Sequence, residues 1–194
     1  MLSMLNAGTG LWVGVGIAVV LFLVVVWIFT TYNALIKLKN NVEEGFATMD
    51  VYMKKRYDLI PNLVETVKGY AKHEKETLTA VMDCRNNALK ATNVKDKAQT
   101  ESQLTDSIKT LFAVAENYPD LKANTNFLDL QQQLTSVEQD IANSRKYYNS
   151  VVKMLNNKVE MFPSNVIAKW FKFTKKDMFE VASSAERENV KVQF

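Results

Sequence analysis

Residues 11–29 read LWVGVGIAVVLFLVVVWIF, an apolar run interrupted only by Gly14 and Gly16. No charged side chain occurs before Lys37. At a helical rise of about 1.5 Å per residue, this run reaches nearly 30 Å, the thickness of the hydrocarbon core of a bilayer. The sequence therefore predicts a membrane-spanning helix over residues 11–32, preceded by a short extracytoplasmic N-terminus of residues 1–10.

Basic residues near the span predict its orientation. None precedes it, whereas Lys37, Lys39 and the cluster at 54–56 follow it, and such residues favour the cytoplasmic side. The run also lacks the basic start and the shorter apolar core, of about 7–15 residues, of a cleaved signal peptide. We expect a retained single-pass anchor with the N-terminus outside and the C-terminal domain in the cytoplasm.

Two sets of residues in the anchor suggest specific contacts. Aromatic side chains mark the two membrane interfaces, where they sit at the level of the headgroups. Small residues recur every four positions and would let a second helix approach closely, although this spacing also arises by chance in membrane helices. The aromatic residues are Trp12, Trp27 and Tyr32, and the small ones are Gly10, Gly14 and Ala18.

The roughly 160 residues after the anchor are enough for one compact domain. The formal net charge of +3 is too small to indicate a nucleic-acid partner. With one cysteine, Cys84, and one histidine, His73, the chain has no internal disulfide and no Cys/His zinc cluster. No catalytic or nucleotide-binding motif is present, so we expect a protein that is not an enzyme, with no cofactor and no metal.

Turn signals are scarce beyond the anchor, which favours an all-α domain. Apolar residues recur at spacings of three and four in four stretches, and the last holds a coiled-coil-like pattern. Pro61 predicts a helix break or kink near Ile60, and Pro119 predicts the start of the fourth helix. We expect residues 33–162 to form an antiparallel four-helix-type bundle. The stretches run over residues 35–53, 63–91, 98–115 and 119–155.

Two polar features beyond the anchor are candidates for function. Arg56, Asp58 and Asn62 surround Pro61 at the expected helix junction, where they could cap amides or close an ion pair. In the C-terminal segment, residues 163–194, aromatics alternate with lysines, which suits either an anionic membrane surface or packing onto the bundle. The residues concerned are Lys169, Trp170, Phe171, Lys172, Phe173, Lys175 and Lys176.

Three blocks of this sequence resemble the LemA family of bacterial membrane proteins. They are KKRYDLIPNLVETVKGYAKHE at 54–74, FAVAENYPDLKANTNF at 112–127 and FPSN at 162–165, and the resemblance runs from about residue 32 to the C-terminus. It implies a bacterial cytoplasmic membrane location, one span and a helical domain like a four-helix bundle. The chain departs from the family at Gly45-Phe46, where Ala-Trp is common, and at Lys172, where glycine is common.

These observations favour a non-enzymatic, membrane-anchored scaffold or adaptor that self-associates at the cytoplasmic face. A membrane-shaping homo-oligomeric assembly is one alternative. Relatives are linked to membrane-associated metalloproteases, so an accessory or regulator of such a protease is another. The expected partners are membrane lipid, further copies of the chain and a membrane protein.

Overall fold

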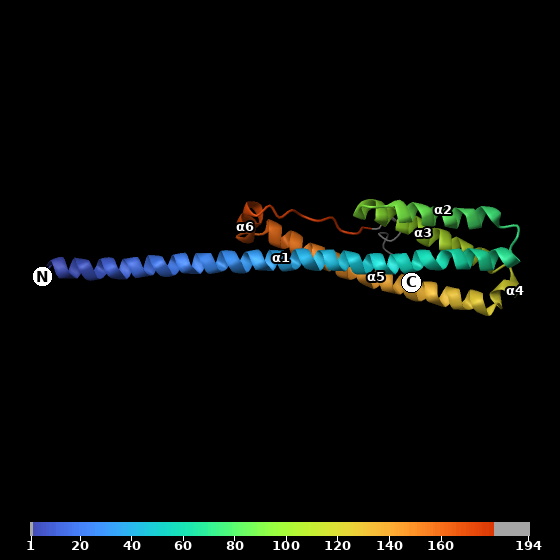
Figure 1. Cartoon of the computed structure of the whole chain (residues 1–194), viewed down its shortest axis with the longest axis horizontal. Coiled ribbons are helices and arrows are strands. Elements are labelled where there is room, and N and C mark those ends of the chain that lie inside the picture. Colours follow the sequence, from blue (N-terminus) through green and yellow to red (C-terminus); the bar gives the residue numbers. More distant parts are fainter. Residues whose placement is uncertain (1, 181–194) are drawn as a thin grey trace, which may run out of the picture. The chain divides into compact units, whose positions relative to one another are not determined.

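A computed structural model describes residues 2–180, with the side chains of Trp12 and of residues 14–180. That part of the chain is helical and contains no strand (Figure 1), which confirms the all-α prediction. The helices are α1 (Leu2–Tyr70), α2 (Lys75–Lys90), α3 (Val94–Ala115), α4 (Pro119–Lys122), α5 (Thr125–Glu160) and α6 (Ser164–Trp170).

The described residues divide into two compact units. Residues 2–42 and 152–176 form one, here called the anchor unit, and residues 43–151 and 177–180 form the other, here called the bundle unit. Both α1 and α5 contribute residues to each unit. The anchor helix therefore continues directly into the first bundle helix, with no linker between them.

The anchor unit begins with an exposed apolar helix. Leucine, valine and phenylalanine side chains such as Leu21 and Phe22 are exposed between Val15 and Phe29. This helix is long and apolar enough to cross a membrane. Among the described side chains of α1, the first buried ones are Thr31 and Leu35. Thr31 lines a pocket together with Met154 of α5 and Ser164 of α6.

The bundle unit buries the apolar stripes that the sequence pattern predicts. Successive long helices alternate in direction within it (Figure 1). Helices with one apolar face pack in this way because each stripe must be removed from water. The most deeply buried side chains include Met49, Met53, Ile60, Leu63, Val67, Leu104, Leu111, Val137 and Leu121.

Of the expected break or kink near Ile60, the break is wrong, because α1 continues through Pro61 to Tyr70. Proline lacks the amide hydrogen that would bind the carbonyl four residues earlier, which is that of Tyr57. Arg85 of α2 replaces the missing donor: its Nε donates to the Tyr57 carbonyl at 2.7 Å. The break falls instead at Ala71–Glu74, so the expected second helix is divided between α1 and α2.

The fourth predicted helix is also interrupted. Pro119 does begin a helix, but α4 lasts only four residues, and α5 starts at Thr125. The side chain of Asn124 explains the new start, since its Oδ1 accepts a 3.0 Å hydrogen bond from the amide of Phe127. Asn93 caps α3 in the same way through the amide of Asp96, at 2.8 Å.

Candidate functional site

The expected interface aromatics come together only in part. Trp12 is exposed near the start of α1, and Trp27 is half-buried at the other end of the apolar run. The Tyr32 ring lies 4.6 Å from that of Phe171 and 6.0 Å from that of Phe173, measured between centroids. Part of the C-terminal aromatic segment therefore packs beside the end of the apolar run.

The remaining C-terminal aromatics fall into two groups. In the anchor unit Trp170 is 69% exposed, and Phe162, in the turn before α6, is 82% exposed. In the bundle unit Phe179 is buried, and its amide donates to Asn149 Oδ1 at 2.7 Å. Phe179 therefore packs onto the bundle, whereas Phe162 and Trp170 are exposed and available to contact a membrane surface. Residues 181–194 lie outside the described part of the chain.

The lysines of this segment are exposed. Lys175 pairs with Glu160 at 2.7 Å, and this hydrogen bond raises the pKa of Lys175. Lys169, Lys172 and Lys176 are exposed as well, in the same stretch as the exposed Trp170. The segment therefore presents both apolar and cationic groups.

Lys172 adopts a left-handed backbone conformation, with φ of 58°. It follows α6, where the amide of Lys172 donates to Lys169 and the amide of Phe173 donates to Ala168 at 2.9 Å. This pair of bonds is a Schellman motif, and its left-handed position strongly favours glycine. In this conformation lysine costs this chain about 1–2 kcal/mol of backbone strain that glycine would avoid.

The small residues of the anchor form no intramolecular contact that the structure describes. Gly14 and Ala18 are exposed, and a Cβ added at Gly14 would meet nothing within 4 Å. The surroundings of Gly10 lie outside the described side chains. This face of the helix is open to a partner or to lipid.

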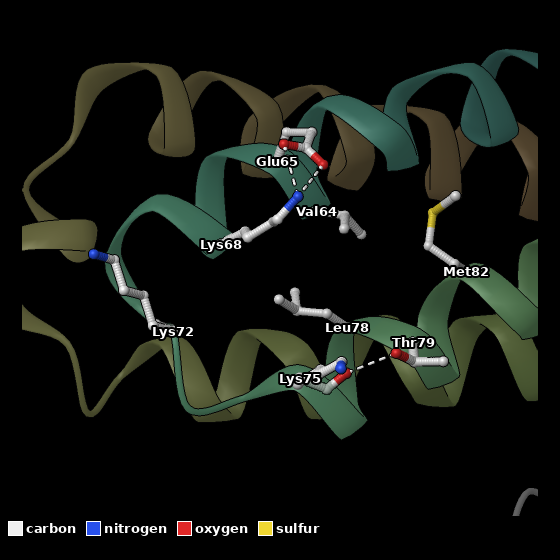
Figure 2. A pocket seen from close by; sticks show the side chains of 9 residues that line it. Val64, Glu65, Lys68, Lys72, Lys75, Leu78, Thr79 and Met82 are labelled. Atoms are coloured by element: carbon white, nitrogen blue, oxygen red, sulfur yellow. Dashed lines mark hydrogen bonds and ion pairs between the residues drawn. The ribbon is translucent and has the colours of Figure 1, made fainter.

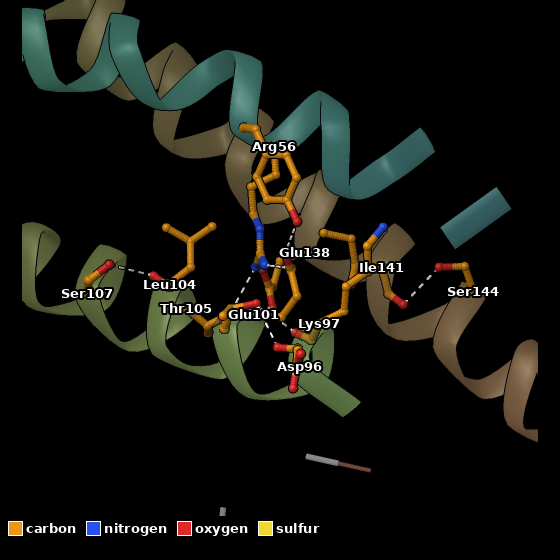
Figure 3. Close-up of polar contacts among 12 residues, drawn as sticks. Arg56, Asp96, Lys97, Glu101, Leu104, Thr105, Ser107, Glu138, Ile141 and Ser144 are labelled. Carbon is orange, nitrogen blue, oxygen red and sulfur yellow. Dashed lines mark hydrogen bonds and ion pairs between the residues drawn. The ribbon is translucent and has the colours of Figure 1, made fainter. Parts of the chain in front are cut away.

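A buried ionic network occupies the bundle unit (Figure 3). Arg56 of α1 is 1% exposed, and its guanidinium points between α3 and α5. It forms ion pairs with Glu101 of α3 and with Glu138 of α5, and it donates to Thr105 Oγ1 at 2.9 Å. One side chain therefore ties three helices together.

Glu101 accepts a second hydrogen bond, from the hydroxyl of Tyr57. Burial raises the pKa of Glu101, while the nearby charge of Arg56 and these hydrogen bonds oppose that rise. Burial also raises the pKa of Tyr57, as does the charge of Glu101, so the tyrosine hydroxyl remains a donor. Glu138 closes the network towards solvent, since its side chain is 46% exposed.

The three polar residues expected at a helix junction, Arg56, Asp58 and Asn62, do not form one cluster. Arg56 enters the core, whereas Asp58 is exposed and pairs with Lys54 at 3.3 Å. Asn62 is also exposed, and its backbone carbonyl accepts from Thr66 at 2.8 Å within α1. Because α1 continues through Pro61, no junction exists for these side chains to cap.

Sequence reasoning missed Glu101 and Glu138. For Glu101 a signal is present: Arg56 stands in the apolar phase of Met53 and Ile60, and Glu101 stands in the phase of Ala98 and Leu104. Charged residues at core positions of two helices are each expensive to bury unless they pair. That pattern marks Arg56 and Glu101 as buried charges that need partners, whereas the pairing itself is set by the packing of α1 against α3.

A groove of about 620 Å³ lies between the end of α1 and the start of α2 (Figure 2). Val64, Leu78 and Met82 form its apolar floor. Lys68, Lys72 and Lys75 line its edge, and Lys68 is paired with Glu65 at 3.1 Å. Its chemistry suits an amphiphilic anion, but its charged groups are all exposed.

Among the described residues, no group of three or more His, Cys, Asp or Glu side chains could hold a metal ion. His73 is exposed between α1 and α2, and Cys84 is half-buried on α2.

The fold and these sites define a class of protein, a helical bundle that carries an N-terminal helix able to span a membrane. The LemA family model matches residues 45–194, and the chain belongs to this family. One relative, Protein LemA of Metamycoplasma hominis, is 28% identical over 167 residues, which are 82% of this chain and 72% of the relative.

Proposed function

We propose that this chain is a non-enzymatic scaffold of the bacterial cytoplasmic membrane that self-associates through its helices. One observation carries the proposal: α1 exposes an apolar surface over Val15–Phe29 and buries an apolar stripe from Leu35 to Val67. A single helix thus supplies both the anchor and one wall of the bundle. Such a helix is suited to holding a folded domain at the membrane.

The proposed orientation places the bundle unit in the cytoplasm, because Lys37 and Lys39 follow the span and no basic residue precedes it. Protease added to everted membrane vesicles should digest the domain. Protection of the domain in those vesicles would contradict this orientation.

Self-association is tested on the full chain, extracted into native nanodiscs and sized by mass photometry and electron microscopy. Gly14→Leu should reduce the oligomer, because it fills the small-residue face of α1. Gly16→Leu is the matched control, since two residues along a helix rotate the side chain by about 200°. A wild-type chain that stays monomeric in lipid would refute the scaffold proposal.

The same experiment separates the two alternatives. An extended or large closed assembly would favour a membrane-shaping role over a small defined scaffold. A metalloprotease that co-purifies with the native particles, and is lost from a variant with an altered bundle surface, would favour an accessory role.

A further inference from the structure

Exposed apolar side chains gather in the anchor unit on the turn after α5 and on α6. We call this set the α6 patch; it consists of Met161, Phe162, Val166, Trp170 and Phe171. Exposed groups of large apolar residues mark surfaces that meet a protein partner or a membrane. Phe162 and Trp170 are the most exposed of the set.

The α6 patch lies beside the end of the apolar run of α1. Trp27 and Thr31 of α1 line a groove of about 400 Å³ whose other wall includes Met161 and Phe162. Phe171 packs against Tyr32, which follows Trp27 by about 7.5 Å along the helix. The patch is therefore placed beside the residues where α1 would leave the hydrocarbon.

Depth along α1 agrees with this placement. The headgroup layer is about 5–8 Å thick on each side of the bilayer. Lys37, the first charged residue of α1, follows Trp27 by about 15 Å at the helical rise. Between Trp27 and Lys37, α1 carries only uncharged residues, and the α6 patch lies alongside this stretch. The stretch is longer than the headgroup layer is thick, so the patch lies at the depth of the headgroups when Trp27 is at the edge of the hydrocarbon.

Charge on the same segment favours lipid over a second copy of the chain. Lys169, Lys172 and Lys176 are exposed in the stretch that carries the aromatics, and each lysine near an anionic leaflet contributes about 1 kcal/mol. Lys172 occupies a position whose φ of 58° favours glycine. A cationic side chain stands there despite the strain.

We propose that the α6 patch is a second membrane contact, lying in the interface of the leaflet from which α1 emerges. Phe162 and Trp170 enter the headgroup region, and Lys169, Lys172 and Lys176 bind anionic phospholipid headgroups. This contact rests on α1 spanning the membrane, as in the proposed function. It would hold the end of α5 at the bilayer surface without a second span.

The three tryptophans of the chain allow a direct test in nanodiscs that contain doxyl-labelled phospholipid. A Trp12→Phe/Trp27→Phe chain reports on Trp170 alone, and a Trp12→Phe/Trp170→Phe chain reports on Trp27 alone. The control is Leu128→Trp in a chain with all three tryptophans replaced by phenylalanine, because Leu128 is exposed on α5 in the bundle unit.

Doxyl lipid should remove most of the emission of Trp27 and of Trp170 and leave the Leu128→Trp reporter unchanged. If doxyl lipid quenches Trp27 but not Trp170, the second contact is overturned and the anchor stands. A shift in the emission wavelength of Trp170 without quenching would indicate contact with another copy of the chain, and it would overturn the lipid contact as well. An unquenched Trp27 would refute the span and the second contact together.

Varying the charge of the lipid tests the role of the lysines. Quenching of Trp170 should be stronger in discs that contain phosphatidylglycerol than in discs of phosphatidylcholine alone. Lys172→Gly relieves the left-handed strain and so preserves α6, yet it should reduce this difference. Equal quenching in both lipids, for both chains, would overturn the assignment of these lysines to anionic headgroups.

Discussion

The Nε of Arg85 donates a 2.7 Å hydrogen bond to the backbone carbonyl of Tyr57, the carbonyl that Pro61 leaves without its helical donor. A long-range side chain thus repairs the hydrogen-bond ladder of α1 at the one proline inside it. This contact also joins α2 to α1 next to the buried network of Arg56.

Arg85→Ala should lower the free energy of unfolding by about 1–3 kcal/mol, the cost of leaving a partly buried carbonyl unpaired. In a Pro61→Ala background the same change should cost much less, because the substituted residue would donate its own amide to the carbonyl of Tyr57. Chemical unfolding of the four chains in mild detergent, followed by helicity, measures this coupling. Equal losses in both backgrounds would mean that Arg85 acts elsewhere.

Arg56→Met should destabilise the bundle unit by about 3–5 kcal/mol, because it leaves Glu101 buried without its cation. Adding Glu101→Leu should recover part of this loss, since the uncompensated carboxylate is removed. Lys54→Met is the matched control: it breaks the exposed pair with Asp58 and should change stability by less than about 1 kcal/mol. Losses that simply add in the double variant would refute direct coupling of Arg56 and Glu101.

The raised pKa of Glu101 predicts the direction in which the free energy of unfolding changes with pH. The folded chain holds this proton more tightly than the unfolded chain, whose carboxyl has the ordinary value of 4.5. The contribution of Glu101 is therefore fully present below pH 4.5 and declines as pH rises towards the folded pKa. Wild-type stability relative to Glu101→Gln should fall over that range in denaturant titrations. A relative gain with rising pH would show that Arg56 lowers the pKa instead.

Gly45 marks a close approach within the bundle unit. A Cβ there would lie 3.3 Å from the Cα of Tyr148 and from the ring of Tyr147. Gly45→Val should destabilise by about 1–3 kcal/mol through overpacking. Gly69→Ala, where a Cβ meets nothing within 4 Å, should instead stabilise by about 0.5–1 kcal/mol through helix propensity. Equal effects at both sites, measured by thermal unfolding, would contradict the close contact.

Local pattern is sufficient for much of the fold. The uncharged run at 11–29 predicts an apolar helix, and the three-and-four spacing predicts the helices that bury Leu63, Leu104 and Val137. These features depend on neighbours along one helix, so they are visible in the sequence. Helix ends are less predictable, because the local effect of Pro61 favours a break that the distant side chain of Arg85 removes.

Only the tertiary structure decides where the candidate site residues meet. The sequence places Arg56 at a junction with Asp58 and Asn62, but Arg56 pairs with Glu101 and Glu138 from two other helices. The alternation of aromatics and lysines singles out the segment around Phe171, whereas the packing of its ring against Tyr32 requires the fold.

By itself the sequence determined the apolar anchor and the helical class, because both follow from side-chain hydropathy and its period along the chain. The tertiary structure decided how Pro61 is tolerated, how the charge of Arg56 is compensated and which aromatics stay exposed. Each of these depends on groups far apart in sequence, whose pairing is set only when the helices pack.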